Sequence, residues 1–363
     1  MKVPFLDLRI TDEQEKKELL EAVDKVFSHG RIVLGPEVKE FEDRVAASCG
    51  RGLGVGVNSG TDALYLALRA AGIGAGDEVI TTSLSWVATA NAIALTGATP
   101  VFADIQDDLN IDPASIETLI TKKTKAIVPV HYTGKVCRMD RIMPLALKHY
   151  LLVIEDASQA FDASYQGGKS GSFGTMGVFS MNAMKVFASC GEAGMIVLDD
   201  KKIYERLISL RYNGTINREE CVEVSLNGRL DTLQAAILLK RMPRVKGIIT
   251  RRRQIALQYM QLLQGCVDLP REQAGETDVY YTFTIKTPRR DELKKYLEEC
   301  GIETKIQHPI LMPDQPAFAG KSYGSYPNAS RLVKTILCLP ANEKLSSDAI
   351  EYVAQCVRKF FSQ

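Results

Sequence analysis

Lys185 is the side chain in this sequence that is best suited to covalent chemistry. It lies in the stretch Phe179–Gly194, which is rich in small and apolar residues and contains no acidic residue before Glu192. Lysine is usually a solvated surface residue. An amine that is partly removed from water becomes a nucleophile that can form a Schiff base. The alternative is a lysine at a strand edge whose stem is buried while its amine reaches water.

A carboxylate and an amide follow another apolar run, in the segment Glu155–Ala160. Strand side chains alternate in direction, so only one of the two acids, Glu155 or Asp156, can face a given ligand. A buried carboxylate needs a cationic partner, and a protonated ring nitrogen would supply one to Asp156. Gln159 could donate a hydrogen bond to a phenolate oxygen of the same ring. The alternative role for Asp156 is a helix cap.

A glycine and several hydroxyl groups open an expected helix in the segment Asn58–Leu64. Gly60 allows close approach of the backbone, and Thr61 adds a hydroxyl to the free amides at the helix start. Together these groups suit a phosphate. A simple N-cap by Ser59 or Thr61 would explain the same residues.

Trp86, the single tryptophan of the chain, is either part of the core or a flat platform for an aromatic ligand. Taken together, these loops require a phosphate, a flat ring, a protonatable ring nitrogen and an aldehyde. Pyridoxal 5′-phosphate (PLP) has all four. We predict that Gly60, Thr61 and Ser180 bind its phosphate. Trp86 would stack on its ring, and Asp156 would keep its nitrogen protonated.

In this hypothesis Lys185 and Asp156 are the catalytic residues. Lys185 carries the cofactor at rest, and it acts as acid and base for proton transfer once a substrate amine has displaced it.

The composition excludes several classes of protein. Of the 363 residues, 45% are hydrophobic and 25% are charged, as in ordinary soluble globular proteins. The formal net charge of +1 creates no field that would attract nucleic acid or an anionic membrane. The N-terminus lacks the apolar run of a signal peptide, and no window approaches the roughly 20 apolar residues of a membrane span.

The cysteines and histidines point to a reducing compartment. The eight cysteines are scattered without a Cys-x-x-Cys pair, and the four histidines do not pair at metal-ligand spacing. This pattern favours reduced thiols over a disulfide framework or a zinc site. We expect a cytoplasmic protein with no bound metal, no nucleic-acid partner and no membrane partner.

Short apolar runs alternate with helical patterns over most of the chain. This alternation predicts an α/β fold, with a mostly parallel seven-stranded sheet flanked by helices on both faces. Ligands of such sheets gather at the carboxyl ends of the strands, where the residues above lie. The expected strands are Leu53–Val57, Val79–Thr82, Thr99–Ala103, Ala126–Val130, Leu151–Ile154, Gly177–Ser180 and Met195–Leu198.

The C-terminal part of the chain has a different periodicity. Residues 230–264 form a helical pattern with a break expected near Pro243, and Tyr280–Ile285 alternates as a strand. We predict a large PLP-binding domain over residues 1–245 and a smaller α+β domain over residues 246–363.

The chain resembles the DegT/StrS family of PLP-dependent nucleotide-sugar aminotransferases, which have the aspartate-aminotransferase-like fold of type I. The resemblance covers nearly the whole length. The matching segments are Val3–Leu8, Asn58–Leu64, Gly76–Ile80, Gly97–Phe102, Glu155–Ala160, Phe179–Lys185 and Asn227–Ile237.

The resemblance implies a homodimer in which Asn227 reaches the cofactor phosphate of the partner subunit. It implies transfer of an amino group, usually from L-glutamate, to a keto-sugar carried on a nucleotide, with pyridoxamine 5′-phosphate (PMP) as the intermediate form of the cofactor. The product would serve amino-sugar or polysaccharide biosynthesis. The segment Arg229–Ala236 is more similar to enzymes that aminate C3 of a dTDP-linked hexose, so C3 is favoured over C4.

The chain also departs from the family pattern near the expected sugar site. Gln307-His308-Pro309 stands where members often have His-Tyr-Pro, and Asn182 replaces a frequent histidine. These departures concern the choice of sugar more than the reaction.

Two other functions remain open from the sequence. One is a PMP-dependent sugar dehydratase, although the dehydratase branch of the family has histidine in place of Lys185. The other is a non-catalytic PLP-binding regulator, although no helix-turn-helix or basic extension is present.

Overall fold

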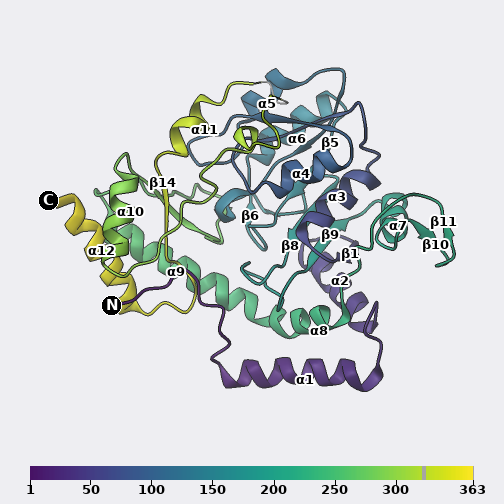
Figure 1. The fold of residues 1–363 in the computed structure, drawn as a ribbon, viewed down its shortest axis with the longest axis horizontal. Coiled ribbons are helices and arrows are strands. Elements are labelled where there is room, and N and C mark those ends of the chain that lie inside the picture. The colour runs from purple at the N-terminus through teal and green to yellow at the C-terminus, as the bar shows by residue number, and fades with distance from the viewer. Residues whose placement is uncertain (321–323, 363) are drawn as a thin grey trace.

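The computed structural model describes residues 1–320 and 324–362 (Figure 1). Its central sheet is made of β1 (Leu53–Val57), β2 (Glu78–Thr82), β3 (Thr99–Ala103), β4 (Thr124–Val128), β5 (Leu152–Asp156), β8 (Met176–Ser180) and β9 (Gly194–Leu198). The strand order is β1-β9-β8-β5-β4-β2-β3. All strands run parallel except β9, which is antiparallel to both neighbours. The predicted α/β class and the mostly parallel seven-stranded sheet are confirmed.

Helices cover both faces of the sheet. One face packs against α2 (Pro36–Ser48), α5 (Pro113–Leu119), α6 (Met139–Lys148) and α8 (Thr232–Arg241), and the other packs against α3 (Gly60–Ala70), α4 (Ala88–Leu95) and α7 (Lys201–Leu210). Side chains alternate between the two cores: in β9, Met195 and Val197 join the first, and Ile196 and Leu198 join the second. A strand that is buried on both faces requires this alternation of apolar residues.

A second, smaller core lies at the C-terminal end of the chain. It is enclosed by α9 (Val245–Leu263), α10 (Arg290–Glu299), α12 (Ser347–Ser362) and the antiparallel pair β13 (Phe283–Lys286) and β14 (Ile336–Leu339). α9 belongs to both cores, because Val245 and Ile249 pack in the first while Ile255 and Tyr259 pack in the second. We therefore propose, as the sequence indicated, that residues 1–245 and 246–363 form two domains joined at this helix.

The remaining elements are peripheral or short. α1 (Glu13–His29) packs on α8 through Ala22 and Val26. The others are β6 (Ser164–Tyr165), β7 (Gly168–Lys169), β10 (Thr215–Ile216), β11 (Glu220–Cys221), β12 (Glu276–Thr277), α11 (Pro327–Leu332) and the 3₁₀ turns Tyr132–Gly134, Met242–Arg244 and Met312–Asp314.

Two element boundaries are set by single residues, one as expected from the sequence and one not. The break expected near Pro243 is present, since the turn Met242–Arg244 separates α8 from α9. The strand expected from Tyr280 begins only at Phe283. Tyr280 has a φ of 46°, in the left-handed region, and cannot continue a strand.

Within residues 1–320 and 324–362, no helix is long and apolar enough to cross a membrane. The same residues contain no group of three or more histidine, cysteine, aspartate or glutamate side chains that could hold a metal ion.

Gly194 begins β9 against the backbone that leads into α3. A Cβ on Gly194 would lie 2.2 Å from the carbonyl oxygen of Ser59, closer than such atoms can approach. Gly194→Ala should therefore lower the free energy of unfolding by about 1–3 kcal/mol, as overpacking does. Urea denaturation measures the change.

Gly247 provides the matched control for this substitution. It lies in α9 with no atom within 4 Å of the position of an added Cβ. Gly247→Ala should stabilise the protein by about 0.5–1 kcal/mol, because it reduces the conformational entropy of the unfolded chain. Equal effects of the two substitutions would contradict the steric argument.

Candidate active site

The predicted phosphate-binding residues meet at the carboxyl ends of β1 and β8. A Cβ on Gly60 would lie 2.6 Å from the Cβ of Ser180, so only glycine allows this close approach. Ser59 caps α3 by accepting a hydrogen bond from the Asp62 amide (3.1 Å). Thr61 is therefore not the capping residue. The first amides of the helix have no intrahelical acceptor and suit an anion.

Asp156 ends β5, and its carboxylate is fixed by two donors. Its Oδ2 accepts from the Thr89 hydroxyl (2.8 Å), and its Oδ1 accepts from the Ser158 amide (3.1 Å). The side chain is only 4% exposed, yet no cation of the described residues forms an ion pair with it. The element that follows Asp156 is the strand β6, not a helix, so Asp156 is not a helix cap.

Glu155 faces the opposite side of the sheet. Its carboxylate accepts hydrogen bonds from the amides of Gly171, Phe173 and Gly174 at 2.7–2.8 Å. It also pairs with His131 (2.9 Å), whose Nδ1 accepts from the Cys137 amide and whose Nε2 therefore donates to Glu155. All of these partners belong to the chain itself, so Glu155 is structural and Asp156 is the acid available to a ligand.

Gln159 is buried and oriented by its neighbour in space. Its Oε1 accepts from the Thr133 amide (3.1 Å). With the oxygen of the amide group engaged in this way, its nitrogen is the end that can donate to a ligand.

Lys185 lies in the connection between β8 and β9. This connection is held together as a hairpin by hydrogen bonds from the Met181 amide to the Ala193 carbonyl (2.8 Å) and from the Ala183 amide to the Gly191 carbonyl (2.9 Å). The Lys185 side chain is partly buried, and its Nζ lies 4.6 Å from the centroid of the Tyr281 ring. No carboxylate of the described residues pairs with this amine.

The rings of Trp86 and His308 lie beside each other. Trp86 is 61% exposed, so it is not a core residue, and its ring centroid lies 5.8 Å from that of His308. Burial and the charges of Lys185 and Lys305 lower the pKa of His308 to about 3. The imidazole is therefore neutral near pH 7, and it contacts the hydroxyl of Tyr132 (3.1 Å).

Asn227 is exposed, and its Oδ1 accepts from the Nε of Arg229 (2.7 Å). The adjacent Gly228 carbonyl accepts from the Asn58 amide (2.9 Å), which places this segment beside the start of α3. Its contact with the cofactor of a partner subunit stays a prediction.

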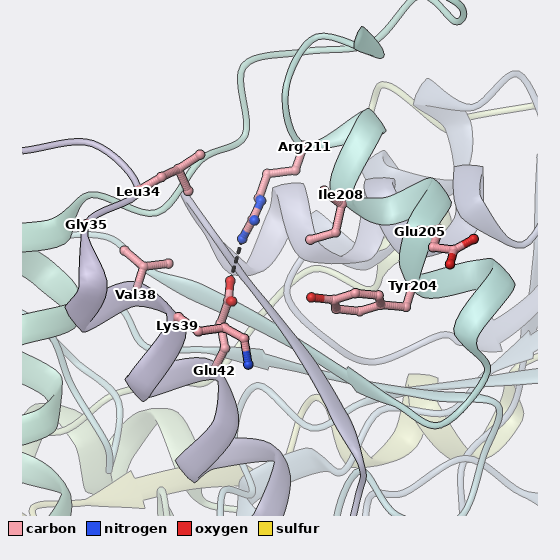
Figure 2. A pocket seen from close by; sticks show the side chains of 9 residues that line it. All are labelled: Leu34, Gly35, Val38, Lys39, Glu42, Tyr204, Glu205, Ile208 and Arg211. Carbon is pink, nitrogen blue, oxygen red and sulfur yellow. Dashed lines mark hydrogen bonds and ion pairs between the residues drawn. The ribbon is translucent and has the colours of Figure 1, made fainter. Parts of the chain in front are cut away.

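A pocket of about 420 Å³ is lined by residues of α2, of α7 and of the segments beside them (Figure 2). At its base Arg211 pairs with Glu42 and donates to the Gly56 carbonyl (2.9 Å), while Glu42 accepts from the Gly56 amide (2.8 Å). Burial raises the pKa of Glu42. The pair fixes the end of β1, the strand that leads into Gly60, and none of the predicted site residues lines the pocket.

Sequence reasoning did not single out Thr89, Thr133 or Tyr281. Thr89 follows Trp86 by three residues, so a hydroxyl one helical turn beyond the predicted ring platform was a usable signal. Thr133 acts through its backbone, and no property of its side chain indicates this. Tyr281 belongs to a segment whose left-handed turn the strand pattern concealed.

The sequence matches the model of the DegT/DnrJ/EryC1/StrS aminotransferase family over residues 13–358. The chain belongs to this family. The family is PLP-dependent, and the protein is accordingly a PLP-dependent aminotransferase. The residues described above fit this cofactor, because a buried carboxylate without a cation faces the site and the glycine cradle lies at a helix start.

Two relatives illustrate the range of names within the family. A "pleiotropic regulatory protein" from Geobacillus stearothermophilus is 40% identical, with 99% of each chain covered. A "dTDP-3-amino-3,4,6-trideoxy-alpha-D-glucose transaminase" from Streptomyces venezuelae is 38% identical, with 99% of this chain and 96% of the relative covered.

Solved structures of the family have the same fold, which is fold type I. DesV from S. venezuelae, in complex with a ketimine intermediate, superposes with a TM-score of 0.96 at 38% identity, covering 100% of this chain and 99% of DesV. NtdA from Bacillus subtilis, with bound PMP, has a TM-score of 0.92 at 30% identity, covering 100% of this chain and 86% of NtdA.

Thr89→Val removes the hydroxyl that donates to Asp156 while keeping the side-chain shape. PLP affinity of the apo-protein should fall about tenfold or more, since a hydrogen bond to a charged group contributes roughly 1.5–3 kcal/mol. Absorbance titration with PLP measures this, and Thr89→Ser, which keeps the donor, should bind within about threefold of the unmodified protein. Unchanged affinity of the valine variant would show that the carboxylate needs no such support.

The lowered pKa of His308 predicts a pH-dependent stability. Between pH 6.5 and 3 the unfolded chain binds a proton at this residue that the folded chain does not, so acid favours unfolding and the contribution is fully present above pH 6.5. His308→Gln should lose about 1–2 kcal/mol less than the unmodified protein between pH 7 and pH 5. Urea denaturation at both pH values tests this, and parallel losses in the two proteins would refute it.

Proposed function

We propose that this aminotransferase moves an amino group from L-glutamate to the C3 keto group of a nucleotide-linked deoxy-keto-sugar. The product is an amino sugar for a polysaccharide or a related glycan. One observation carries the proposal: Asp156 is a buried carboxylate that accepts from the Thr89 hydroxyl, and it has no cationic partner among the described residues.

Contacts lead from Asp156 through Thr89 and Trp86 to His308. The Thr89 hydroxyl donates to Asp156 at 2.8 Å and lies 3.5 Å from the Trp86 carbonyl oxygen. The Trp86 ring packs against His308, which is close enough to Lys185 for the charge of the amine to affect its titration. Asp156 ends the strand β5, whereas Lys185 lies in the connection between β8 and β9.

We assign the roles of the site residues from this geometry. Bound PLP supplies an electron-withdrawing ring that stabilises negative charge at a substrate carbon. Asp156 holds the proton on the ring nitrogen, and Gln159 donates to the phenolate oxygen. Lys185 attaches the cofactor and then moves the proton at the reacting carbon through its Nζ.

The phosphate and the ring are held by the remaining predicted residues. Gly60, Thr61 and Ser180 bind the phosphate at the start of α3, and Trp86 covers the ring. Asn227, on an exposed segment beside α3, reaches the phosphate bound by the partner subunit in a homodimer.

The substrate assignment has two sources of support. The S. venezuelae relative is named for a 3-amino sugar carried on dTDP, and the sequence over Arg229–Ala236 has the form seen in enzymes that aminate C3. The donor, L-glutamate, follows from the resemblance to the family. All eight cysteines are unpaired thiols, which agrees with a cytoplasmic location.

Lys185→Ala tests the reaction type. The variant should not attach PLP covalently and should not convert it to the PMP form with glutamate, because the amine that attaches the cofactor and moves the proton is gone. Borohydride reduction followed by peptide mass spectrometry measures attachment, and absorbance measures the response. Lys39→Ala, which removes an exposed lysine paired with Asp43, should behave as the unmodified protein.

A panel of dTDP- and UDP-linked 3-keto and 4-keto sugars tests the acceptor. The protein is first converted to the PMP form with glutamate, and the sugar that restores the visible absorbance of the PLP form is the acceptor. An amine at C3 in the product supports the proposal. A product without an amine would indicate a dehydratase, and absence of any response to glutamate would indicate a regulator.

A further inference from the structure

The turn Asp278–Thr282 has a backbone conformation that requires support. Tyr280 has a φ of 46°, a left-handed conformation that is costly for a bulky residue. The Oδ1 of Asp278, a residue only 5% exposed, accepts a hydrogen bond from the Tyr280 amide (2.6 Å). The carboxylate therefore closes the turn and holds the strained residue in place.

A second strained segment packs directly against this turn. Thr133 has a φ of 62° and Gly134 a φ of 113°. The Val279 amide donates to the Gly134 carbonyl and the Thr282 amide donates to the Thr133 carbonyl, both at 3.2 Å. A Cβ on Gly134 would lie 2.8 Å from the Tyr281 nitrogen and 2.9 Å from Oδ1 of Asp278, so the two backbones leave no space between them.

The paired segments contact two side chains of the candidate active site. The ring of Tyr281 lies 4.6 Å from Nζ of Lys185, and the amide of Thr133 donates to Gln159. Arg252, which is buried, donates to the Tyr281 carbonyl (3.3 Å) and so adds a further contact to the turn. Backbone strain persists only where the surrounding structure enforces it, and it is often found at active sites. Here the strained Thr133 contacts Gln159, and the strained Tyr280 directly precedes Tyr281, which contacts Lys185.

The Tyr281 ring suits the Lys185 amine, which must leave the ring face and return to it during the reaction. A carboxylate beside Lys185 would hold the ammonium group by a strong, directional ion pair. The face of a tyrosine ring attracts the same group more weakly and from a range of positions. The amine is thus kept near one place without being held there.

We propose that Asp278 and Tyr281 are positioning residues for the transamination. Asp278 sets the turn, the turn places the Tyr281 ring, and the ring returns the free Lys185 amine to the same position in each catalytic cycle. This inference rests on the role proposed for Lys185, but not on the identity of the sugar.

The first test measures the reactivity of Lys185 in the apo-protein, without any substrate. Trace acetylation with acetic anhydride and peptide mass spectrometry compares Lys185 with the exposed Lys39. In Tyr281→Leu, labelling of Lys185 relative to Lys39 should rise about threefold to tenfold, because the cation–π contact is lost. Tyr281→Phe keeps the ring and should stay within about twofold of the unmodified protein.

The second test separates the hydrogen bond of Asp278 from its charge. Asp278→Asn keeps an acceptor for the Tyr280 amide, and Asp278→Ala does not. The alanine variant should reproduce the labelling of Tyr281→Leu, and the asparagine variant should restore the labelling of the unmodified protein. Circular dichroism at each step confirms that the variants are folded.

Kinetics provide the readout that a purely structural role would not change. With an accepted keto-sugar, Tyr281→Leu should lower kcat about tenfold or more while KM stays within about twofold, since the amine acts in the proton transfer. Gly134→Ala should show the same pattern. Gly167→Ala, at a positive φ of 84° with no atom within 4 Å of the added Cβ, controls for backbone strain alone.

Different results would contradict the positioning role of Tyr281 and the proposed substrate. Unchanged labelling in Tyr281→Leu, or equal damage from Tyr281→Phe and Tyr281→Leu, would overturn the positioning role. If the labelling changes as expected but no sugar of the panel reacts, the positioning role stands and the substrate assignment is wrong.

Discussion

The burial of the Asp156 carboxylate is the constraint on which the site depends. An ionised group in a largely dry environment is costly unless hydrogen bonds and an opposite charge compensate for it. Thr89 and Ser158 supply the hydrogen bonds, and the described chain supplies no cation. This arrangement supports the role proposed above for Asp156, as partner of a protonated ring nitrogen of the cofactor.

Glu155, the acid next to Asp156 in β5, has a structural role because it faces the other side of the sheet. Glu155 is satisfied by three backbone amides and by His131, all within the protein. A shift of one residue in the register of β5 would exchange the two acids and would leave both without suitable partners. The two acids therefore have suitable partners only when β5 keeps its observed register.

The parts of the site that lie at strand ends could be predicted from sequence. Asp156 and Ser180 end β5 and β8, and Gly60 follows β1, so an apolar run followed by a polar residue was enough to find them. The strands themselves were recognisable because each apolar run is buried on both faces. Leu53–Val57 and Thr99–Ala103 match the expectation at both ends, and no end of the other strands differs by more than two residues.

What the sequence could not reveal were contacts made by the backbone or across long separations. The spacing from Trp86 could have drawn attention to Thr89, but not to its partner, because Thr89 and Asp156 are 67 residues apart. The turn at Tyr280 looked like a strand because its side chains alternate, whereas its conformation is set by Asp278 and by the backbone at Gly134. Periodicity reports which side chains are buried, but it does not report where a polar group bends the chain.

The reversed direction of β9 allows a short connection from β8, and this connection carries Lys185. Parallel neighbours need a crossover of a dozen or more residues, usually a helix, whereas an antiparallel neighbour lets the chain turn straight back. Because β9 pairs with β8 in this way, the segment that carries Lys185 is tied to the sheet at both ends. Its interior carries Asn182, a departure from the family pattern, while both ends of the segment keep their places on the sheet.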